Sequence, residues 1–266
     1  MDTPILRPYL KSISDAIRTK LGTTEKINAS DFAEKILSIP TGGGDDLWDY
    51  YQENGSRKNY KRAFTGCVWD ENTLKPKYSI KPTNANQMFY YAKNLRSLKN
   101  VVTNVKRNNP DFEFDTSLCT DLTGFIQAAD NVTELPEIST VSCNAVDQFL
   151  FWNALLKSVD KLILKSDGSQ NFTNSFSGLS ALTDIVIEGK FGCNVNISSS
   201  SKLTKNSIIS IINALHENAS NKTITFSKDA INREFGIDVD NTSTYPEGSE
   251  FHTLRYSKSN WNFAYA

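Results

Sequence analysis

The apolar residues in the middle of the chain recur in a fixed order. Five positions around Cys119 return around Cys143 with a constant offset of 24. The pairs are Phe114 with Ile138, Cys119 with Cys143, Leu122 with Val146, Phe125 with Phe149, and Val132 with Leu156. One unit of this size cannot bury its apolar face alone, whereas stacked units bury a continuous core. The spacing therefore predicts a stack of similar coils through this part of the chain.

Two further copies of the unit flank this central pair. The copy that follows has an offset of 23, which aligns Phe149 with Phe172. The copy that precedes aligns Met88 with Phe125, and this wider offset of 37 implies an insertion that we place within residues 103–114. In this register one buried column is expected to contain Leu95, Val132, Leu156 and Leu179.

The shared unit reads apolar-x6-apolar-x2-apolar-x2-apolar, and its clearest copy is FTNSFSGLSALTDIVIEG at residues 172–189. The spacing of three indicates tight turns of 3₁₀ type, and the terminal IVI indicates a short strand. A Leu-rich period of this length is typical of leucine-rich repeats. We therefore expect an α/β fold, with a leucine-rich-repeat-like solenoid of short parallel strands over residues 88–200.

The N-terminal residues 1–44 do not carry the repeat. They are expected to form a two-helix module for attachment or oligomerisation. Leu10, Ile13 and Ile17 lie on one face of the first helix, and a second short helix is expected over residues 28–40, before a flexible TGGG hinge. Two helices of this size cannot hold a core of their own, so they must pack on the rest of the chain, on another copy or on another protein.

Both ends of the repeat region need a cover. Residues 45–87 are expected to form an aromatic-rich N-terminal cap on the open end of the stack. Its aromatic residues include Trp48, Tyr50, Tyr51, Tyr60, Phe64 and Trp69. Residues 201–266 are expected to form a C-terminal βα cap, with a helix that starts at Thr204, a strand over 221–227 and a short helix or turn over 228–236.

Composition and charge exclude some partners. The 266 residues include 29 Lys and Arg and 30 Asp and Glu, for a net charge of −1, so no basic surplus points to nucleic acid. The longest apolar run, residues 149–156, is too short to span a membrane. The first residues lack the apolar stretch of a secretory signal, so we expect the chain to be made in a cytoplasm.

The chain offers little for a metal, a cofactor or a nucleophile. The four cysteines, Cys67, Cys119, Cys143 and Cys193, are too far apart for a zinc pattern, and the only histidines are His216 and His252. We expect no metal and no cofactor. Because Cys119 and Cys143 occupy the same position in successive units, they are expected to lie adjacent, buried and reduced.

Several stretches resemble a known family. Residues 10–44, LKSISDAIRTKLGTTEKINASDFAEKILSIPTGGG, resemble the N-terminal helical module of tail-associated proteins of phages and prophages that infect Gram-positive gut bacteria. The stretches PKYSIKPTNANQMF, KLILKSDGSQNF and SKLTKNSIISIINALHENASNKTITFSKDAIN resemble their leucine-rich repeats of bacterial-surface type. The likeness covers roughly residues 10–235 and ends after Gly236, because the final segment is longer and more polar than usual.

The resemblance implies a virion protein of the tail fibre or baseplate. Such a protein would serve a structural or receptor-binding role, with a host-surface polymer or another virion protein as its partner. An alternative is an intracellular phage-encoded protein that binds a host factor, such as a defence protein. A glycan depolymerase would use two carboxylates about 5–10 Å apart. Asp160, Asp184 and Glu188 are candidates, but the repeat places them on solvent faces, so we expect no enzyme.

A homo-oligomer is expected, and a trimer is favoured because phage fibres are commonly trimeric. The strand positions that point away from the core include Val102, Ile163 and Val186, which form an outward apolar row that needs a cover. The candidate interface combines this row with Leu10, Ile13 and Ile17 of the N-terminal module.

A candidate ligand-binding surface comes from two aromatic pairs at turn positions of the repeat, Tyr90 with Tyr91 and Phe151 with Trp152. The equivalent pairs in the other units are Gln127 with Ala128 and Asn174 with Ser175. One interpretation is that the aromatic rings pack beneath the N-terminal aromatic segment or the insertion. The other is a platform for host cell-wall carbohydrate, in which flat rings cover the apolar face of a sugar while nearby amides bind its hydroxyl groups.

Overall fold

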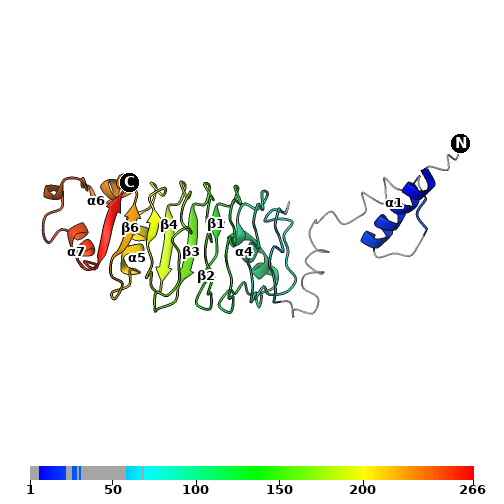
Figure 1. Ribbon diagram of the computed structural model, residues 1–266, viewed down its shortest axis with the longest axis horizontal. Helices are drawn as coiled ribbons and strands as arrows, with labels where there is room; N and C mark the ends of the chain where they lie inside the picture. Colours follow the sequence, from blue (N-terminus) through cyan, green and yellow to red (C-terminus); the bar gives the residue numbers. More distant parts are fainter. Residues whose placement is uncertain (1–5, 22–25, 29, 31–57, 67–68) are drawn as a thin grey trace.

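Two sheets of short parallel strands and five α-helices make up the described part of the chain, which is a mixed α/β protein (Figure 1). The computed structural model describes residues 6–21, 26–28, 30, 58–66 and 69–266. In Figure 1 the coils lie side by side along the long axis, from the coils around α4 (Leu98–Asn108) to β7 (Trp261–Tyr265).

The first sheet lies in the repeat region. It contains β1 (Glu134–Leu135), β2 (Ile138–Ser139), β3 (Ser158–Ile163) and β4 (Asp184–Glu188). Both β1 and β2 pair in parallel with β3, and the Cα partners Glu134 with Ser158 and Ile138 with Leu162 follow the offset that the sequence predicts. Pro136 separates β1 from β2, because proline has no N–H group to give to the ladder.

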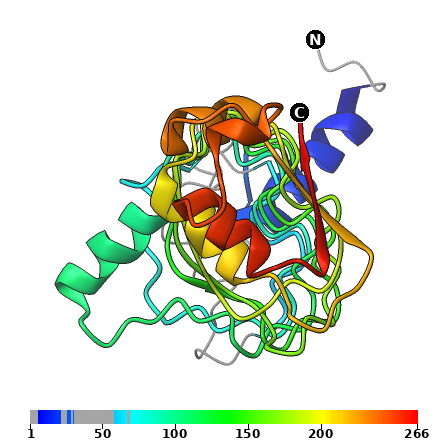
Figure 2. The same ribbon diagram turned by 90° about the vertical axis from the view of Figure 1, so that its left-hand side faces the viewer.

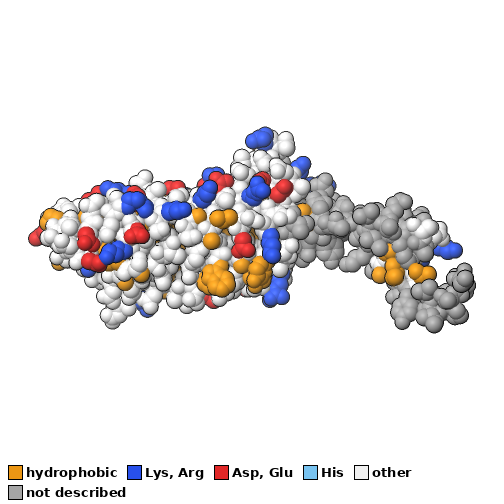
Figure 3. All heavy atoms as spheres, turned by 90° about the horizontal axis from the view of Figure 1, so that it is seen from above, with side chains coloured by type: hydrophobic (Ala, Val, Ile, Leu, Met, Phe, Trp, Pro, Cys, Tyr) orange, Lys and Arg blue, Asp and Glu red, His pale blue; other side chains and the backbone are white. Residues whose placement is uncertain are grey.

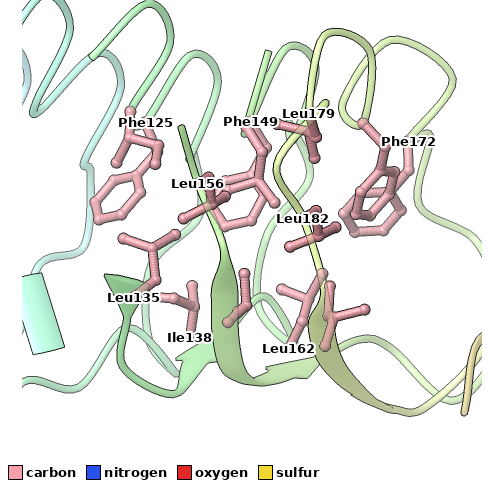
Figure 4. Close-up of a cluster of buried hydrophobic side chains, with 14 of the residues drawn as sticks. Phe125, Leu135, Ile138, Phe149, Leu156, Leu162, Phe172, Leu179 and Leu182 are labelled. Atoms are coloured by element: carbon pink, nitrogen blue, oxygen red, sulfur yellow. The ribbon is translucent and has the colours of Figure 1, made fainter. Parts of the chain in front are cut away.

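The predicted register of the next copy is wrong. Val159 pairs with Ile185 rather than with Leu182, and Leu162 pairs with Ile187 rather than with Ile185, with a bulge between the two pairs. Leu182 therefore takes the place opposite Leu156 that was expected for Leu179. The apolar residues here recur every three positions, so a slip of three positions keeps apolar groups aligned and the pattern cannot distinguish the two registers. All three leucines are fully buried in the shared core (Figure 4).

The first copy ends in a helix rather than the expected strand. Ser97 caps α4, because its hydroxyl accepts a hydrogen bond from the N–H group of Asn100 at 2.9 Å. Seen along the stack, α4 lies outside the outline of the coils (Figure 2). The insertion thus starts earlier than predicted. Val102 lies on this helix, half-buried against the core, and not on a strand.

Aromatic residues fill one side of the core. The rings of Phe125 and Phe149 stack at 5.8 Å with an interplanar angle of 20°, as expected for equivalent positions on adjacent coils (Figure 4). Tyr60, Phe64 and Trp69 of the N-terminal aromatic segment belong to the same core and are at most 2% exposed. Trp48, Tyr50 and Tyr51 lie outside the described residues.

The C-terminal part adds a second parallel sheet. It contains β5 (Val195–Ile197), β6 (Lys222–Phe226) and β7, in that order. The helices around it are α5 (Lys205–Asn213), α6 (Lys228–Phe235), a 3₁₀ turn η3 (Thr242–Thr244) and α7 (Glu250–Tyr256). The first helix, strand and second helix match the predicted elements, and Figure 2 shows α7 lying across the end of the stack.

Polar contacts hold the final segment, residues 237–266, against the loop after α5. The ammonium group of Lys258 donates to the carbonyl of Leu215 at 2.7 Å and to the carboxylate of Glu217 at 2.8 Å. The indole N–H group of Trp261 donates to the carbonyl of His216 at 2.9 Å.

At the other end, α1 (Leu6–Leu21) is the predicted first helix. Ile17 on its apolar face is buried, as is Ile27, whereas Leu10 and Ile13 are 38% and 43% exposed. The second helix expected over residues 28–40 lies almost entirely outside the described residues. Within the part that the structure describes, every helix is too short or too polar to cross a membrane.

Candidate binding surface

Five residues with left-handed backbone conformation form one column across successive coils. They are Gly66, Tyr91, Ala128, Trp152 and Gly178, with φ angles of 65°, 54°, 53°, 59° and 80°. The N–H group of each of the first four donates to the carbonyl of the residue before the next member: from Gly66 to Tyr90 at 2.7 Å, Tyr91 to Gln127 at 3.3 Å, Ala128 to Phe151 at 3.1 Å and Trp152 to Ser177 at 3.0 Å. We call these five residues the left-handed column.

The column corrects one predicted equivalence. The pair that corresponds to Phe151 and Trp152 in the next coil is Ser177 with Gly178, not Asn174 with Ser175. The same change of register that moves Leu182 into the place of Leu179 causes this shift.

Two large aromatic residues occupy positions where glycine is the natural choice. The left-handed conformation costs a residue with a side chain about 1–2 kcal/mol, because its Cβ approaches the following carbonyl. Gly66 and Gly178 show that the column itself accepts glycine. The backbone therefore does not require Tyr91 or Trp152. Arg62, Gln87 and Gln148 at another turn have similar φ angles, so the exposure of the two rings, together with the strain, is the reason to look for a function in these side chains.

Each of these aromatic residues is paired with the ring before it. Tyr90 and Tyr91 meet edge to face at 4.3 Å, and Phe151 and Trp152 stack at 5.0 Å with an interplanar angle of 15°. Tyr91 is 42% exposed and Trp152 is 62% exposed. Figure 3 shows hydrophobic side chains gathered in two clusters on one face of the molecule.

The two aromatic pairs stand two coils apart, which is a separation of about 10 Å between backbones at the usual spacing of parallel strands. Between them the column holds Ala128, whose small side chain is only 6% exposed. The exposed rings therefore stand on either side of a position that has no protruding side chain. This arrangement suits a ligand that is long enough to touch both pairs, such as two or more units of a polymer.

Polar and cationic groups surround the tyrosine pair. The guanidinium group of Arg62 donates to the amide oxygen of Gln87 at 2.7 Å, and the ammonium group of Lys93 lies 6.0 Å from the centre of the Tyr91 ring. A hydrogen bond with the Tyr91 side chain raises the pKa of Tyr90 above its usual range. The site can thus offer hydrogen-bond donors, hydrogen-bond acceptors and flat apolar surface together.

The exposure of these rings bears on the two interpretations of the aromatic pairs. Neither α4 nor the described residues of the N-terminal segment cover Tyr91 or Trp152. The partly buried rings, Tyr90 and Phe151, support the exposed ones. Among the residues that the structure describes, the four aromatic side chains form a surface and do not fill a core.

The carboxylates considered for a depolymerase are engaged with neighbouring side chains. Asp160 accepts a hydrogen bond from Lys99 at 2.7 Å, Glu188 pairs with Lys161 at 3.4 Å, and Asp184 accepts from Thr204 at 3.2 Å. All three are exposed, as the repeat pattern predicts.

The predicted outward apolar row is not continuous. Ile163 is half-buried and pairs with Glu188, whereas Val186, which is 51% exposed, lies in the bulge between the paired positions. Val102 is on α4. The row fails because it assumed one constant register, which both the insertion and the shifted pairing of β4 break.

The left-handed column was not found from the sequence, although it leaves a signal. Gly66 stands one coil before Tyr91, and Gly178 stands one coil after Trp152. Aligned glycines at one turn position indicate a positive φ angle. The signal is hidden because the spacing differs from coil to coil.

Comparison with known proteins adds no assignment to this geometry. No family model matches the chain, and neither curated protein sequences nor solved structures give a significant match.

Proposed function

We propose that this chain is a glycan-binding protein whose leucine-rich-repeat-like solenoid presents Tyr90, Tyr91, Phe151 and Trp152 as an aromatic platform for a host-surface polymer. The observation that carries the proposal is the presence of Tyr91 and Trp152, both exposed, at strained backbone positions that accept glycine. Rings that fill no core and carry a conformational cost are best explained by a ligand.

The solenoid assignment is supported by the ladder of hydrogen bonds between coils. Parallel partners recur from one coil to the next through β1, β2, β3 and β4, and equivalent turns are joined along the left-handed column. Each coil shares its core with its neighbours, as repeat proteins do. Such a scaffold fixes the distance between the two aromatic pairs, so it favours polymers with a matching repeat.

The setting we propose is the virion of a phage that infects a Gram-positive bacterium, with the protein in a tail fibre or baseplate. The resemblance of residues 10–44 and 201–232 supports this setting, with the N-terminal module as the attachment or oligomerisation part. Mass spectrometry of purified virions tests it. Detection of the chain only in the lysate of infected cells would favour the intracellular alternative.

The platform is tested with the double variant Tyr91→Gly and Trp152→Gly. Glycine relieves the left-handed strain, which offsets the lost ring contacts and the greater freedom of the unfolded chain, so the melting temperature should stay within about 4 °C of the wild type. Binding to purified Gram-positive cell walls, measured by cosedimentation, should be lost.

Ala128→Gly is the matched control, because it makes the same kind of backbone change in the same column without removing a ring. It should bind as the wild type does. Full retention of cell-wall binding by the folded double variant would remove the platform from consideration.

A further inference from the structure

The net charge of −1 hides a strong partition of charge along the chain. Residues 58–107 contain eleven Lys and Arg but only two Asp and Glu, a net charge of +9. Residues 108–266 contain eleven Lys and Arg and nineteen Asp and Glu, a net charge of −8. On the face in Figure 3, Lys and Arg side chains are prominent at the end of the stack that holds the first of these segments. This end therefore carries a positive field that the overall charge does not reveal.

Most cations of the basic segment have no acidic partner among the described residues. Only Lys81 and Lys99 of the eleven form ion pairs there, with Glu113 and Asp160. In residues 108–266, by contrast, six of the eleven cations do so. Cations that gather in one place without an acidic partner retain their charge for an external anion.

Two cavities lie in this segment, and Lys93 connects one of them with the tyrosine pair. The first, of about 280 Å³, is lined by Lys93 and Arg96, and Lys93 also stands over the Tyr91 ring. The second, of about 490 Å³, is lined by Lys75, Lys77 and Arg107. Glu71 and Asn72 line both cavities, so the two adjoin.

The lining of the cavities matches a charged sugar. Four asparagines line the larger cavity and three line the smaller one, and amides both donate to and accept from hydroxyl groups. The five cations face only two acids. Asp70 is already held by Thr73 and Asn72, whereas Glu71 has a buried carboxylate oxygen without a hydrogen-bond partner in the described structure.

We infer that the ligand of the platform is an anionic polysaccharide, which runs from the Tyr90 and Tyr91 pair into the two adjoining cavities beside the last turn of α4. This inference rests on the proposed function and names its ligand class. The rings would cover apolar sugar faces, the amides would bind hydroxyl groups, and the cations would bind carboxylate or phosphate groups carried by the polymer.

The test measures binding of the full-length protein to polygalacturonate and to its methyl ester, which has the same sugar chain but no carboxylate charge. The wild type should bind the charged polymer about tenfold or more tightly than the ester, and a rise in salt should weaken that binding by about tenfold. The cavity variant replaces three exposed cations: Lys75→Gln, Lys77→Gln and Arg107→Gln. It should bind polygalacturonate about tenfold less tightly.

A control variant removes the same number of charges from the acidic part of the chain: Lys157→Gln, Lys202→Gln and Lys222→Gln. It should bind as the wild type does. The substituted residues of both variants lie on the surface, and circular dichroism checks that both variants fold. Equal affinity for the two polymers, or no binding of polygalacturonate, would overturn the inference. If the glycine double variant still loses cell-wall binding in that case, the platform stands and only the anionic assignment fails.

Two further results would overturn the saccharide assignment. One is that the wild type binds single-stranded DNA as tightly as polygalacturonate and that the cavity variant loses the DNA binding. This would indicate a general site for polyanions. The other is salt-sensitive self-association in sedimentation that the cavity variant abolishes, which would indicate that the basic end binds the acidic end of another copy.

Discussion

Trp152 lies over Gly178 of the next coil, so closely that a Cβ atom built on Gly178 would stand 2.8 Å from Cδ1 of the indole. Gly178 thus has two effects at this contact. It adopts a φ angle of 80° without strain, and it leaves room for the ring. We expect Gly178→Ala to lower the free energy of unfolding by at least about 2 kcal/mol, in urea titrations, because both effects are lost.

Gly66→Ala separates these two effects. Gly66 stands in the same column with a φ angle of 65°, but nothing lies within 4 Å of its added Cβ atom. Only the conformational cost of about 1 kcal/mol should remain. In the Trp152→Gly background, the cost of Gly178→Ala should be smaller but should stay above that of Gly66→Ala, because Cα of residue 152 would still stand 3.1 Å from the added Cβ atom. An equal cost of Gly178→Ala with and without Trp152 would show that the ring does not rest on this glycine.

The core register gives a second matched pair, Leu155 and Leu156. Leu156 is fully buried in the shared core, whereas Leu155 is 48% exposed. Leu156→Ala should lower the free energy of unfolding by about 2–5 kcal/mol, because it leaves a cavity in that core. Leu155→Ala should change it by about 0.5 kcal/mol or less. Chemical denaturation of both variants checks this, and similar losses would place both leucines in the same environment.

The α/β class and the parallel pairing of short strands could be predicted from the sequence, because buried positions recur with a fixed spacing. The pairing of Ile138 with Leu162 is an example. The next offset could not be predicted, since residues that recur every three positions fit two registers equally. The helix α4 was missed because its Val101 and Val102 also suit a strand, and the decisive contact is the cap that Ser97 provides.

The candidate site, like the fold, could be predicted from the sequence only in part. The aromatic pairs were visible as residue types at a repeated position. The strain was not, because tyrosine and tryptophan give no sign of a left-handed conformation. The cavities were also hidden, since they join Lys75 to Arg107, which are far apart in the sequence, through the packing of a loop on α4.

The two central cysteines should be inert to thiol reagents in the folded protein. The thiol of Cys143 donates to the carbonyl of Cys119 at 2.9 Å, and neither residue is exposed. Its contact with Cys119 and its burial raise the pKa of Cys143, whereas the same contact lowers the pKa of Cys119, so burial is the property that protects both thiols. We expect labelling only through unfolding, in a background with Cys67→Ser and Cys193→Ser. Rapid labelling of both sites in buffer would contradict their burial.

The trimer remains a prediction that concerns α1. Leu10 and Ile13 are exposed on the same helix face whose Ile17 is buried, which leaves part of an apolar face for a partner. Leu10→Ser with Ile13→Ser should convert the trimer to a monomer in light scattering without changing the melting temperature of the coil stack. The variant keeps Ser14, because this residue of the same helix is buried. A wild-type monomer at high concentration would end this proposal.

Glu217 should make part of the stability depend on pH. Its carboxylate accepts from Lys190 at 2.7 Å and from Lys258 at 2.8 Å, and these contacts lower the pKa of Glu217 from 4.5 to about 2. Because the folded-state pKa lies below the unfolded value, the contribution is complete above pH 4.5 and is lost as the pH falls toward 2. The side chain is 57% exposed, so solvent screening keeps the direct contribution below about 1 kcal/mol.

Glu217→Gln should therefore lower the free energy of unfolding at pH 7 and have little effect near pH 2. The loss at pH 7 should exceed that of an ordinary surface pair, because the Lys258 side chain is only 7% exposed and its ammonium group would lose the one anionic partner that the described residues give it. Glu247→Gln is the control, since Glu247 is exposed and forms no ion pair among the described residues. Urea titrations at pH 7, 4 and 2.5 measure the difference. A loss for Glu217→Gln that is the same at all three pH values would show that the carboxylate charge does not hold this contact.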